Sequence, residues 1–157
     1  MKNKLVIALA VGLALGVSTT AQAQGRSHIG PQVGYNFDYK AVVVGAQFSA
    51  PLAQHLEFYP SFNYYFMDAG LKVWSVNLDL KYRLPIEHAD WLYLGGGLNV
   101  TRASAGGGSN TDANVNLLAG LESRAGNIHP FGEFRLTAGN GSTIQLVGGL
   151  NLTLGHH

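Results

Sequence analysis

Cysteine is absent from the 157 residues of this chain, so neither a disulfide framework nor a thiolate metal site is available. Charged residues are scarce, at 12% of the chain against about 25% in a typical soluble domain. No run of basic residues occurs, and nothing indicates a nucleic-acid partner. Beyond the first two dozen residues no segment comes near 18 consecutive apolar residues, which excludes a transmembrane helix there. The chain must therefore fold without covalent staples and with few charges.

The first 23 residues have the layout of a cleavable secretory signal. Lys2 and Lys4 form a positive start, residues 5–17 are unbroken apolar, and a small-x-small pattern ending at Ala23 predicts cleavage there. This apolar core is too short to remain comfortably as a membrane-spanning helix. Removing the segment takes two of the ten basic residues and no acid, which leaves eight Lys and Arg against nine Asp and Glu. We expect a signal peptide at 1–23 and one mature domain at 24–157, exported from a bacterial cell.

Apolar and polar residues alternate through the mature part, at the period that places strand side chains on opposite faces of a sheet. In the clearest segment the even positions from Trp74 to Leu84 are apolar, and Ser, Asn, Asp, Lys and Arg stand between them. The alternating segments lie near 28–39, 41–50, 55–66, 72–84, 91–102, 113–124, 128–138 and 143–154. Turn-rich stretches separate them, and one sizeable loop is expected at 104–112. These lengths suit tilted strands that cross a bilayer, so we predict an all-β fold, an eight-stranded antiparallel up-and-down transmembrane β-barrel.

Alternation alone does not decide whether the apolar face meets lipid or fills a core. A soluble barrel of the lipocalin kind would carry many charges on its outer face, whereas the polar face here is mostly Gly, Ser, Asn, Gln and Thr. We interpret that face as a crowded lumen in which acids and bases nearly balance and can pair. The expected lumenal charge network is Glu57, Asp79, Lys81, Arg83, Glu122, Arg124, Glu133 and Arg135. Glu57 with Lys81 is the specific pair we predict; the alternative is exposed ion pairs of little energetic value.

Aromatic residues give a second indication of orientation. With the N-terminus in the periplasm they fall into two separate groups, as in the aromatic girdles of membrane barrels. The external group is Phe37, Tyr39, Tyr64, Phe66 and Trp74, and the periplasmic group is Phe58, Tyr82 and Trp91. The same topology places the loop at 104–112 outside the cell.

Little in the sequence points to catalysis, a cofactor or a metal. No Ser or His takes a lipid-facing position within a predicted strand and no GxSxG motif occurs, which disfavours a lipid-modifying enzyme. We interpret His28, His55 and His129, which share lumenal parity near the periplasmic end, as polar fillers and not as metal ligands. Because an eight-stranded barrel is just wide enough to be filled by its own side chains, bulk pore activity is not expected.

The signal segment, the alternating segments, the lumenal charges and blocks such as LYLGGGLNV (92–100) and IQLVGGLNLTLG (144–155) carry a family likeness. Over residues 25–157 the chain resembles the small bacterial outer-membrane β-barrels, close in architecture to the OmpA transmembrane domain. The resemblance implies contact with outer-membrane lipid and folding by the barrel assembly machinery. Such proteins usually end their last strand with an aromatic residue that this machinery reads, whereas Leu154 takes that position here.

We therefore expect a non-enzymatic integral protein of the bacterial outer membrane, with a structural or surface-interaction role and a side-chain-filled lumen. It needs no cofactor. A soluble periplasmic, lipocalin-like carrier of an apolar ligand is the alternative, and a lipid-modifying outer-membrane enzyme comes third. The sequence leaves the oligomeric state open.

Overall fold

The structure, a computed structural model, describes residues 25–140 and 142–155. The signal peptide predicted at 1–23 and the final two histidines lie outside the described residues. No helix in the described ranges is long and apolar enough to cross a membrane. The strands in chain order are β1 (His28–Asn36), β2 (Ala41–Pro51), β3 (Leu56–Phe66), β4 (Lys72–Arg83), β5 (Leu92–Ala105), β6 (Gly108–Glu122), β7 (Ile128–Ala138) and β8 (Thr143–Thr153).

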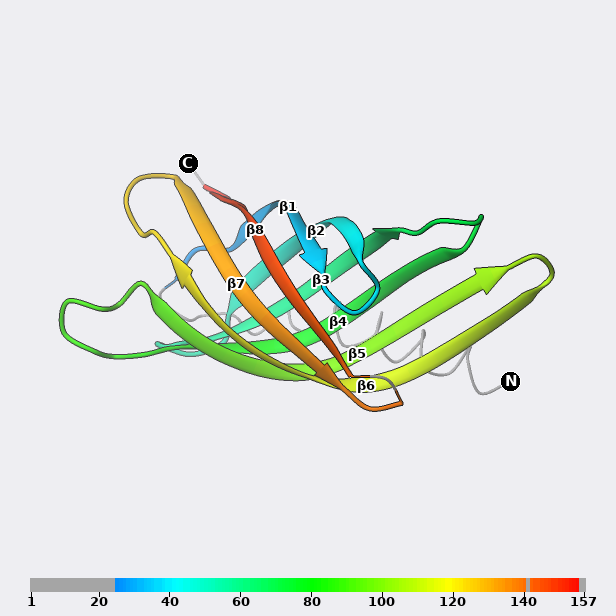
Figure 1. The fold of residues 1–157 in the computed structure, drawn as a ribbon. Helices are drawn as coiled ribbons and strands as arrows, with labels where there is room; N and C mark the ends of the chain where they lie inside the picture. Colours follow the sequence, from blue (N-terminus) through cyan, green and yellow to red (C-terminus); the bar gives the residue numbers. More distant parts are fainter. Residues whose placement is uncertain (1–24, 141, 156–157) are drawn as a thin grey trace.

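Each strand pairs antiparallel with the next one along the chain, and β1 also pairs with β8 (Figure 1). That last pairing closes the sheet, and closure removes the unpaired edges that an open sheet would expose along its wall. The predicted fold class, an eight-stranded antiparallel up-and-down barrel, is confirmed.

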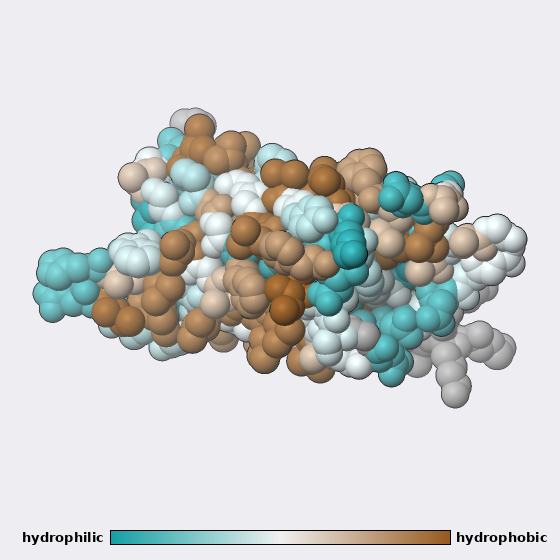
Figure 2. Space-filling view, viewed as in Figure 1, coloured by the Kyte–Doolittle hydropathy of each residue, from teal (hydrophilic) through white to brown (hydrophobic). Residues whose placement is uncertain are grey.

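The wall of the barrel is mostly polar inside and apolar outside. On β4, Asp79 and Lys81 are 0% exposed, whereas Leu80 between them is 45% exposed. A similar alternation of buried and exposed positions runs along most of the other strands, because successive side chains point to opposite faces, and is weakest on β5. Figure 2 shows the result on one face of the molecule, where a broad hydrophobic band lies between more hydrophilic ends. This distribution is the reverse of that in a water-soluble barrel.

The loop predicted at 104–112 is instead the end of a long β-hairpin. Pairing between β5 and β6 continues as far as Ala105 opposite Gly108, so the prediction of a sizeable loop is wrong. Gly106 and Gly107 alone form the turn, with φ of 45° and 106°. Two-residue hairpin turns need such positive φ values, which glycine adopts without strain. Figure 1 shows this hairpin projecting from the end of the barrel opposite the C-terminus.

The two ends of the lumen have different linings. At the end with the β1–β2 and β3–β4 turns, an apolar cluster of Ala41, Val43, Tyr65 and Val73 lies inside the wall. At the other end, where β1 begins and β8 ends, the lining is polar and charged. The charged side chains therefore meet in the half of the lumen nearer that end.

Candidate functional site in the lumen

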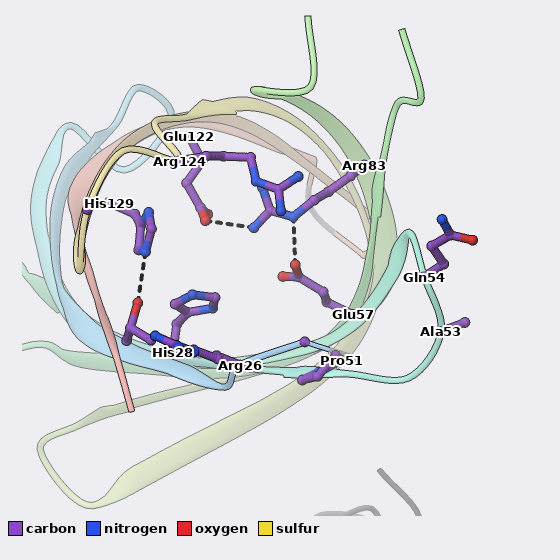
Figure 3. A pocket seen from close by; sticks show the side chains of 13 residues that line it. Arg26, His28, Pro51, Ala53, Gln54, Glu57, Arg83, Glu122, Arg124 and His129 are labelled. Atoms are coloured by element: carbon purple, nitrogen blue, oxygen red, sulfur yellow. Dashed lines mark hydrogen bonds and ion pairs between the residues drawn. The ribbon is translucent and has the colours of Figure 1, made fainter. Parts of the chain in front are cut away.

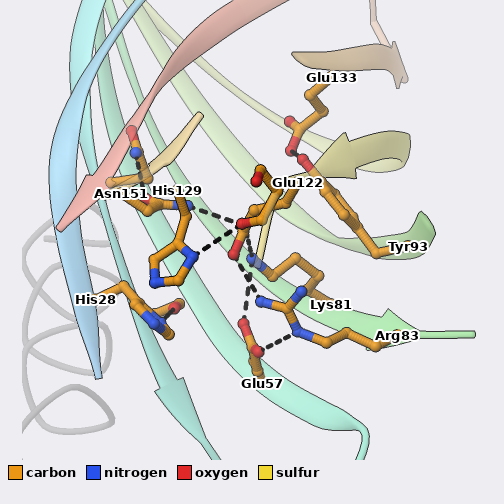
Figure 4. A network of polar contacts seen from close by, with 12 residues as sticks. His28, Glu57, Lys81, Arg83, Tyr93, Glu122, His129, Glu133 and Asn151 are labelled. Atoms are coloured by element: carbon orange, nitrogen blue, oxygen red, sulfur yellow. Dashed lines mark hydrogen bonds and ion pairs between the residues drawn. The ribbon is translucent and has the colours of Figure 1, made fainter. Parts of the chain in front are cut away.

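Four charged side chains from three strands meet inside the barrel (Figure 4). Lys81 of β4 places its Nζ 3.1 Å from Oε2 of Glu57 on β3 and 2.9 Å from Oε2 of Glu122 on β6. Arg83 donates from Nε to Oε1 of Glu57 at 2.6 Å and from Nη2 to Oε1 of Glu122 at 2.7 Å. Each base thus contacts both acids. Glu57 lies directly opposite Lys81 in the β3–β4 register, so the structure brings together the pair that the sequence predicts.

In a second charged group, two carboxylates contact the same arginine. Arg135 of β7 donates from Nη1 to Oδ2 of Asp79 on β4 at 2.8 Å, and from Nη2 to Oε1 of Glu133 at 2.8 Å. Neutral donors complete both carboxylates: Asn116 Nδ2 lies 3.0 Å from Oδ1 of Asp79, and the Tyr93 hydroxyl donates to Oε2 of Glu133 at 2.9 Å. One guanidinium therefore serves two carboxylates.

Two tyrosine rings pack around the lysine. Tyr59 and Tyr93 are 0% exposed, and the Nζ of Lys81 lies 4.5 Å and 4.8 Å from their ring centroids. A ring face attracts a cation within about 6 Å. Gly120 makes room for Tyr93, because a Cβ added there would lie 2.4 Å from the end of that ring and from its hydroxyl. Side chains thus fill the lumen at this level.

Pairing is what makes this burial of charge tolerable. An isolated ion in a low-dielectric interior costs several kcal/mol, and deleting one partner of a buried pair costs about 3–5 kcal/mol. The remainder of the lumen is largely filled by neutral groups that bond to one another. For example, Oδ1 of Asn77 accepts from Asn99 at 2.7 Å and from Asn116 at 2.9 Å. The buried neutral polar side chains include Gln32, Asn36, Gln47, Ser61, Asn63, Ser75, Asn114, Gln145 and Asn151.

Arg124 lines the mouth of the lumen but does not join the enclosed charges, so its prediction as a member of the charge network is wrong. It lies in the turn after β6 with its side chain 54% exposed, and its Nη1 is 3.7 Å from Oδ2 of Asp90 in another turn. Because β6 ends at Glu122, strand parity no longer holds two residues later. The remaining predicted members are all buried in the lumen: Glu57, Asp79, Lys81, Arg83, Glu122, Glu133 and Arg135.

The charged end of the lumen opens into a cavity of about 290 Å³ (Figure 3). Glu57, Arg83 and Glu122 line it together with His28 and His129. The three charged residues are the same ones that pair with Lys81 or with each other, so the cavity is the mouth of the lumen and not a separate pocket.

The predicted histidine fillers separate into two places. The rings of His28 and His129 meet edge to face with centroids 4.9 Å apart, and both ring nitrogens of His129 lie 2.8 Å from protein oxygens. His55 precedes β3, and its ring centroid lies 6.3 Å from that of Tyr82, a residue of the outer face. The prediction that His55 points into the lumen is therefore wrong. Nowhere in the described part of the chain do three His, Cys, Asp or Glu side chains form a group that could hold a metal ion.

The aromatic residues of the two predicted groups lie at opposite ends of the barrel. The group at the β1–β2 and β3–β4 turns includes Phe37 and Phe66, which are 52% and 57% exposed. At the other end, Tyr82 and Trp91 are 43% and 42% exposed. The remaining members are Tyr39, Tyr64 and Trp74 in the first group and Phe58 in the second.

Sequence reasoning missed the large apolar side chains of the lumen. Tyr59 is two residues from Glu57 on β3, and Tyr93 is six from Asn99 on β5, so strand parity places both inside. The prediction from sequence assigns neither residue to a face, although parity alone places both in the lumen. The other missed members include Val43, Tyr65, Val73, Leu118, Phe131 and Val147.

The barrel is similar to solved structures of outer-membrane proteins. The N-terminal β-barrel domain of Pseudomonas aeruginosa OprF matches with a TM-score of 0.68 and 17% identity, over 85% of this chain and 100% of that one. Neisserial surface protein A (NspA) matches with a TM-score of 0.62 and 15% identity, over 82% and 95% of the two chains. Ail, the attachment invasion locus protein of Yersinia pestis, matches with a TM-score of 0.50 and 15% identity, over 82% and 97%. No family model and no curated protein matches the sequence.

The chain therefore has the fold of the bacterial outer-membrane β-barrels. More narrowly, it has the small, OmpA-like, eight-stranded form of that fold, which the sequence resemblance implies. At 15–17% identity this likeness concerns the fold.

Proposed function

We propose that this protein is a non-enzymatic integral protein of the bacterial outer membrane with a structural or surface-interaction role, exported by a cleaved signal peptide. The observation that carries the proposal is the inverted distribution of side chains. Leu98, Val115 and Leu117 on neighbouring strands are 60%, 52% and 58% exposed, while charged groups fill the interior. In water this wall would leave a continuous apolar surface uncovered, whereas in a bilayer it meets acyl chains.

The aromatic groups at the two ends of the wall support the same location. Tyr and Trp collect at membrane–water interfaces because one part of the ring system prefers lipid and the polar atom prefers water. Trp74 and Trp91, from opposite groups, would mark the two interfaces. The partners in this proposal are outer-membrane lipid and, during biogenesis, the barrel assembly machinery.

The ends of the barrel suggest its orientation. Outer-membrane barrels have short periplasmic turns and longer external segments. The β5–β6 hairpin extends from the end opposite the C-terminus, and we assign that end to the outside. The exposed hairpin is then available for surface interactions, together with the other turns at that end.

The filled lumen supports a structural role over bulk transport. Ion pairs cross the interior between strands that are not neighbours, and the rings of Tyr59 and Tyr93 and many amide side chains are buried beside them. A wide aqueous channel needs a larger barrel, such as the porins of 16–18 strands.

The two alternative functions have less support. A soluble carrier of an apolar ligand needs an apolar cavity, but the cavity here is lined by charged and polar side chains, including Glu57, Arg83 and Glu122. A lipid-modifying enzyme needs a nucleophile beside a base. Because β5 and β6 are longer than expected, Ser104 and Ser109 do take outward-facing strand positions. Ser109 accepts a hydrogen bond from Arg102, whose guanidinium stays protonated and so cannot take the proton of a nucleophile.

Reconstitution tests the membrane proposal directly. Mature protein refolded with phospholipid vesicles should float with them in a density gradient, resist extraction by carbonate, and migrate differently in SDS gels before and after boiling. Protein that stays in aqueous solution without lipid or detergent, and that migrates identically with and without boiling, would refute the proposal.

A further inference from the structure

We infer that Lys72 and Arg102 form a binding site for the phosphate of a lipid headgroup on the outer face of the barrel. The inference rests on the proposed membrane location and goes beyond it, because it assigns a particular lipid contact to particular residues.

Charge on the outer face is confined to this one place within the described strands. Charged strand residues elsewhere are buried in the lumen, apart from Asp112, which shares the inward parity of Asn114 and Asn116. Lys72 and Arg102 have the opposite parity: they alternate with buried Val73 on β4 and with inward-facing Asn99 and Thr101 on β5. Both outward charges are basic.

The register places the two bases beside each other. Lys72 pairs with Ser104, and Arg102 pairs with Trp74, so the two bases are diagonal neighbours across β4 and β5. Diagonal positions in a sheet lie about 7–8 Å apart, which two long basic side chains can span around one phosphate group. Arginine also offers parallel N–H groups that fit phosphate oxygens, and lysine adds a point charge.

Neither base forms an ion pair within the described part of the chain. Arg102 donates from Nη2 to Oγ of Ser109 at 3.3 Å, which leaves its other N–H groups available. Among residues 25–140 and 142–155, no acidic side chain lies within ion-pair distance of Arg102 or Lys72.

The neighbouring residues indicate the depth of the site in the bilayer and the kind of ligand that it would bind. Lys72 lies opposite Phe66 and Arg102 lies opposite Trp74, both in the aromatic group at the hairpin end. Towards the middle of the wall, the next outward residue of β5 is Val100, which begins the apolar band. Basic side chains at the boundary between aromatic rings and an apolar wall meet headgroups, and phosphate is the anionic group that headgroups present there. A water-soluble anion would gain nothing from the neighbouring aromatic rings and apolar wall.

The two tryptophans, one at each end of the barrel, make the experiment possible. A Trp91→Phe variant leaves Trp74, next to the site, as the sole tryptophan, and Trp74→Phe leaves Trp91 as the reporter at the opposite end. Each variant is refolded into phosphatidylcholine vesicles that contain either brominated phosphatidic acid or brominated phosphatidylcholine at the same mole fraction. Quenching of the remaining tryptophan measures the relative association of the two lipids.

Around Trp74 we expect phosphatidic acid to be preferred by about fivefold for each basic residue, and around Trp91 we expect no preference. Lys72→Gln and Arg102→Gln should each lower the ratio at Trp74, and together they should bring it to about one. Arg124→Gln removes the same charge at the other end and should leave the ratio unchanged. A ratio near one in the parent, a preference retained in the double variant, or an equal loss in Arg124→Gln would each overturn the inference.

The same measurement separates this inference from the proposed function. If brominated phosphatidylcholine quenches neither tryptophan, the chain is not in the bilayer and both fail. If it quenches both tryptophans but phosphatidic acid is not preferred at Trp74, the lipid site alone is refuted. A brominated fatty acid, whose headgroup is a carboxylate, should be preferred less than phosphatidic acid, and equal preference would overturn the assignment to phosphate.

Discussion

The shared ion pairs of the lumen should be energetically coupled, and a double-mutant cycle on Glu57 and Lys81 measures that coupling. Glu57→Gln keeps the shape of the side chain and removes its charge. Lys81→Met keeps an unbranched stem in place and removes the ammonium. The two variants are made singly and together, so the interaction between the positions is separated from the effect of each change alone.

The structure sets the expected sizes. Glu57→Gln leaves Lys81 and Arg83 to share Glu122, whose oxygens lie 2.9 and 2.7 Å from them, so we expect a loss of about 3 kcal/mol in the free energy of unfolding. Lys81→Met leaves two carboxylates on one guanidinium and should cost about 3–5 kcal/mol. In the double variant one acid still pairs with one base, so the loss should be smaller than the sum by about 1–3 kcal/mol.

Urea unfolding of vesicle-embedded protein, followed by tryptophan fluorescence, gives each free energy as long as the m-value stays constant. Arg124→Gln is the matched control, because its side chain lies outside the network, and it should change stability by no more than about 0.5 kcal/mol. A coupling energy near zero between Glu57 and Lys81, or a cost for Arg124→Gln as large as that for Glu57→Gln, would refute the shared network.

Three further substitutions test other parts of the structure by the same unfolding measurement. Leu98→Arg on the outward face of β5 should cost about 2–4 kcal/mol, against about 0–1 for Ser104→Arg beyond the apolar band; equal costs would contradict a membrane-embedded wall. Gly120→Ala should cost about 1–3 kcal/mol because its Cβ meets a buried tyrosine ring, whereas at Gly132 an added Cβ meets nothing within 4 Å and the same change should be nearly silent. Asp79→Asn should cost less than Glu57→Gln, because it leaves one base, Arg135, with one carboxylate, whereas Glu57→Gln leaves two bases sharing the single carboxylate of Glu122; a larger cost for Asp79→Asn would contradict this difference.

The strands were predictable because their signal is local. Alternation from Trp74 to Leu84 appears in the residues themselves, since neighbouring side chains of a strand always face opposite ways. Strand ends were harder to place. The composition of 104–112, rich in Gly and Ser, indicates a loop, yet pairing continues through it until Gly106 because each strand supplies backbone partners to the other. Backbone pairing of this kind leaves no signal in the pattern of side chains along the sequence.

The lumenal residues were predictable as a class and less well as individuals. Parity places Glu122 inside correctly, but the same reasoning fails for Arg124 because the strand ends between them. Parity also places Tyr59 and Tyr93 inside, against the expectation that apolar residues face outward. The two rings face inward because they pack around the ammonium group of Lys81, and a ring face attracts a cation.

The amino-acid sequence by itself determined the number of strands, their antiparallel succession and which residues are polar on each, because these follow from side-chain period and turn composition. Only the tertiary structure decided which charges meet. The contacts of Glu122 with Lys81 and of Arg135 with Asp79 cross the lumen between strands that are not neighbours in the sheet. Such contacts depend on the stagger of all eight strands around the closed barrel, and no single segment of the chain carries that information.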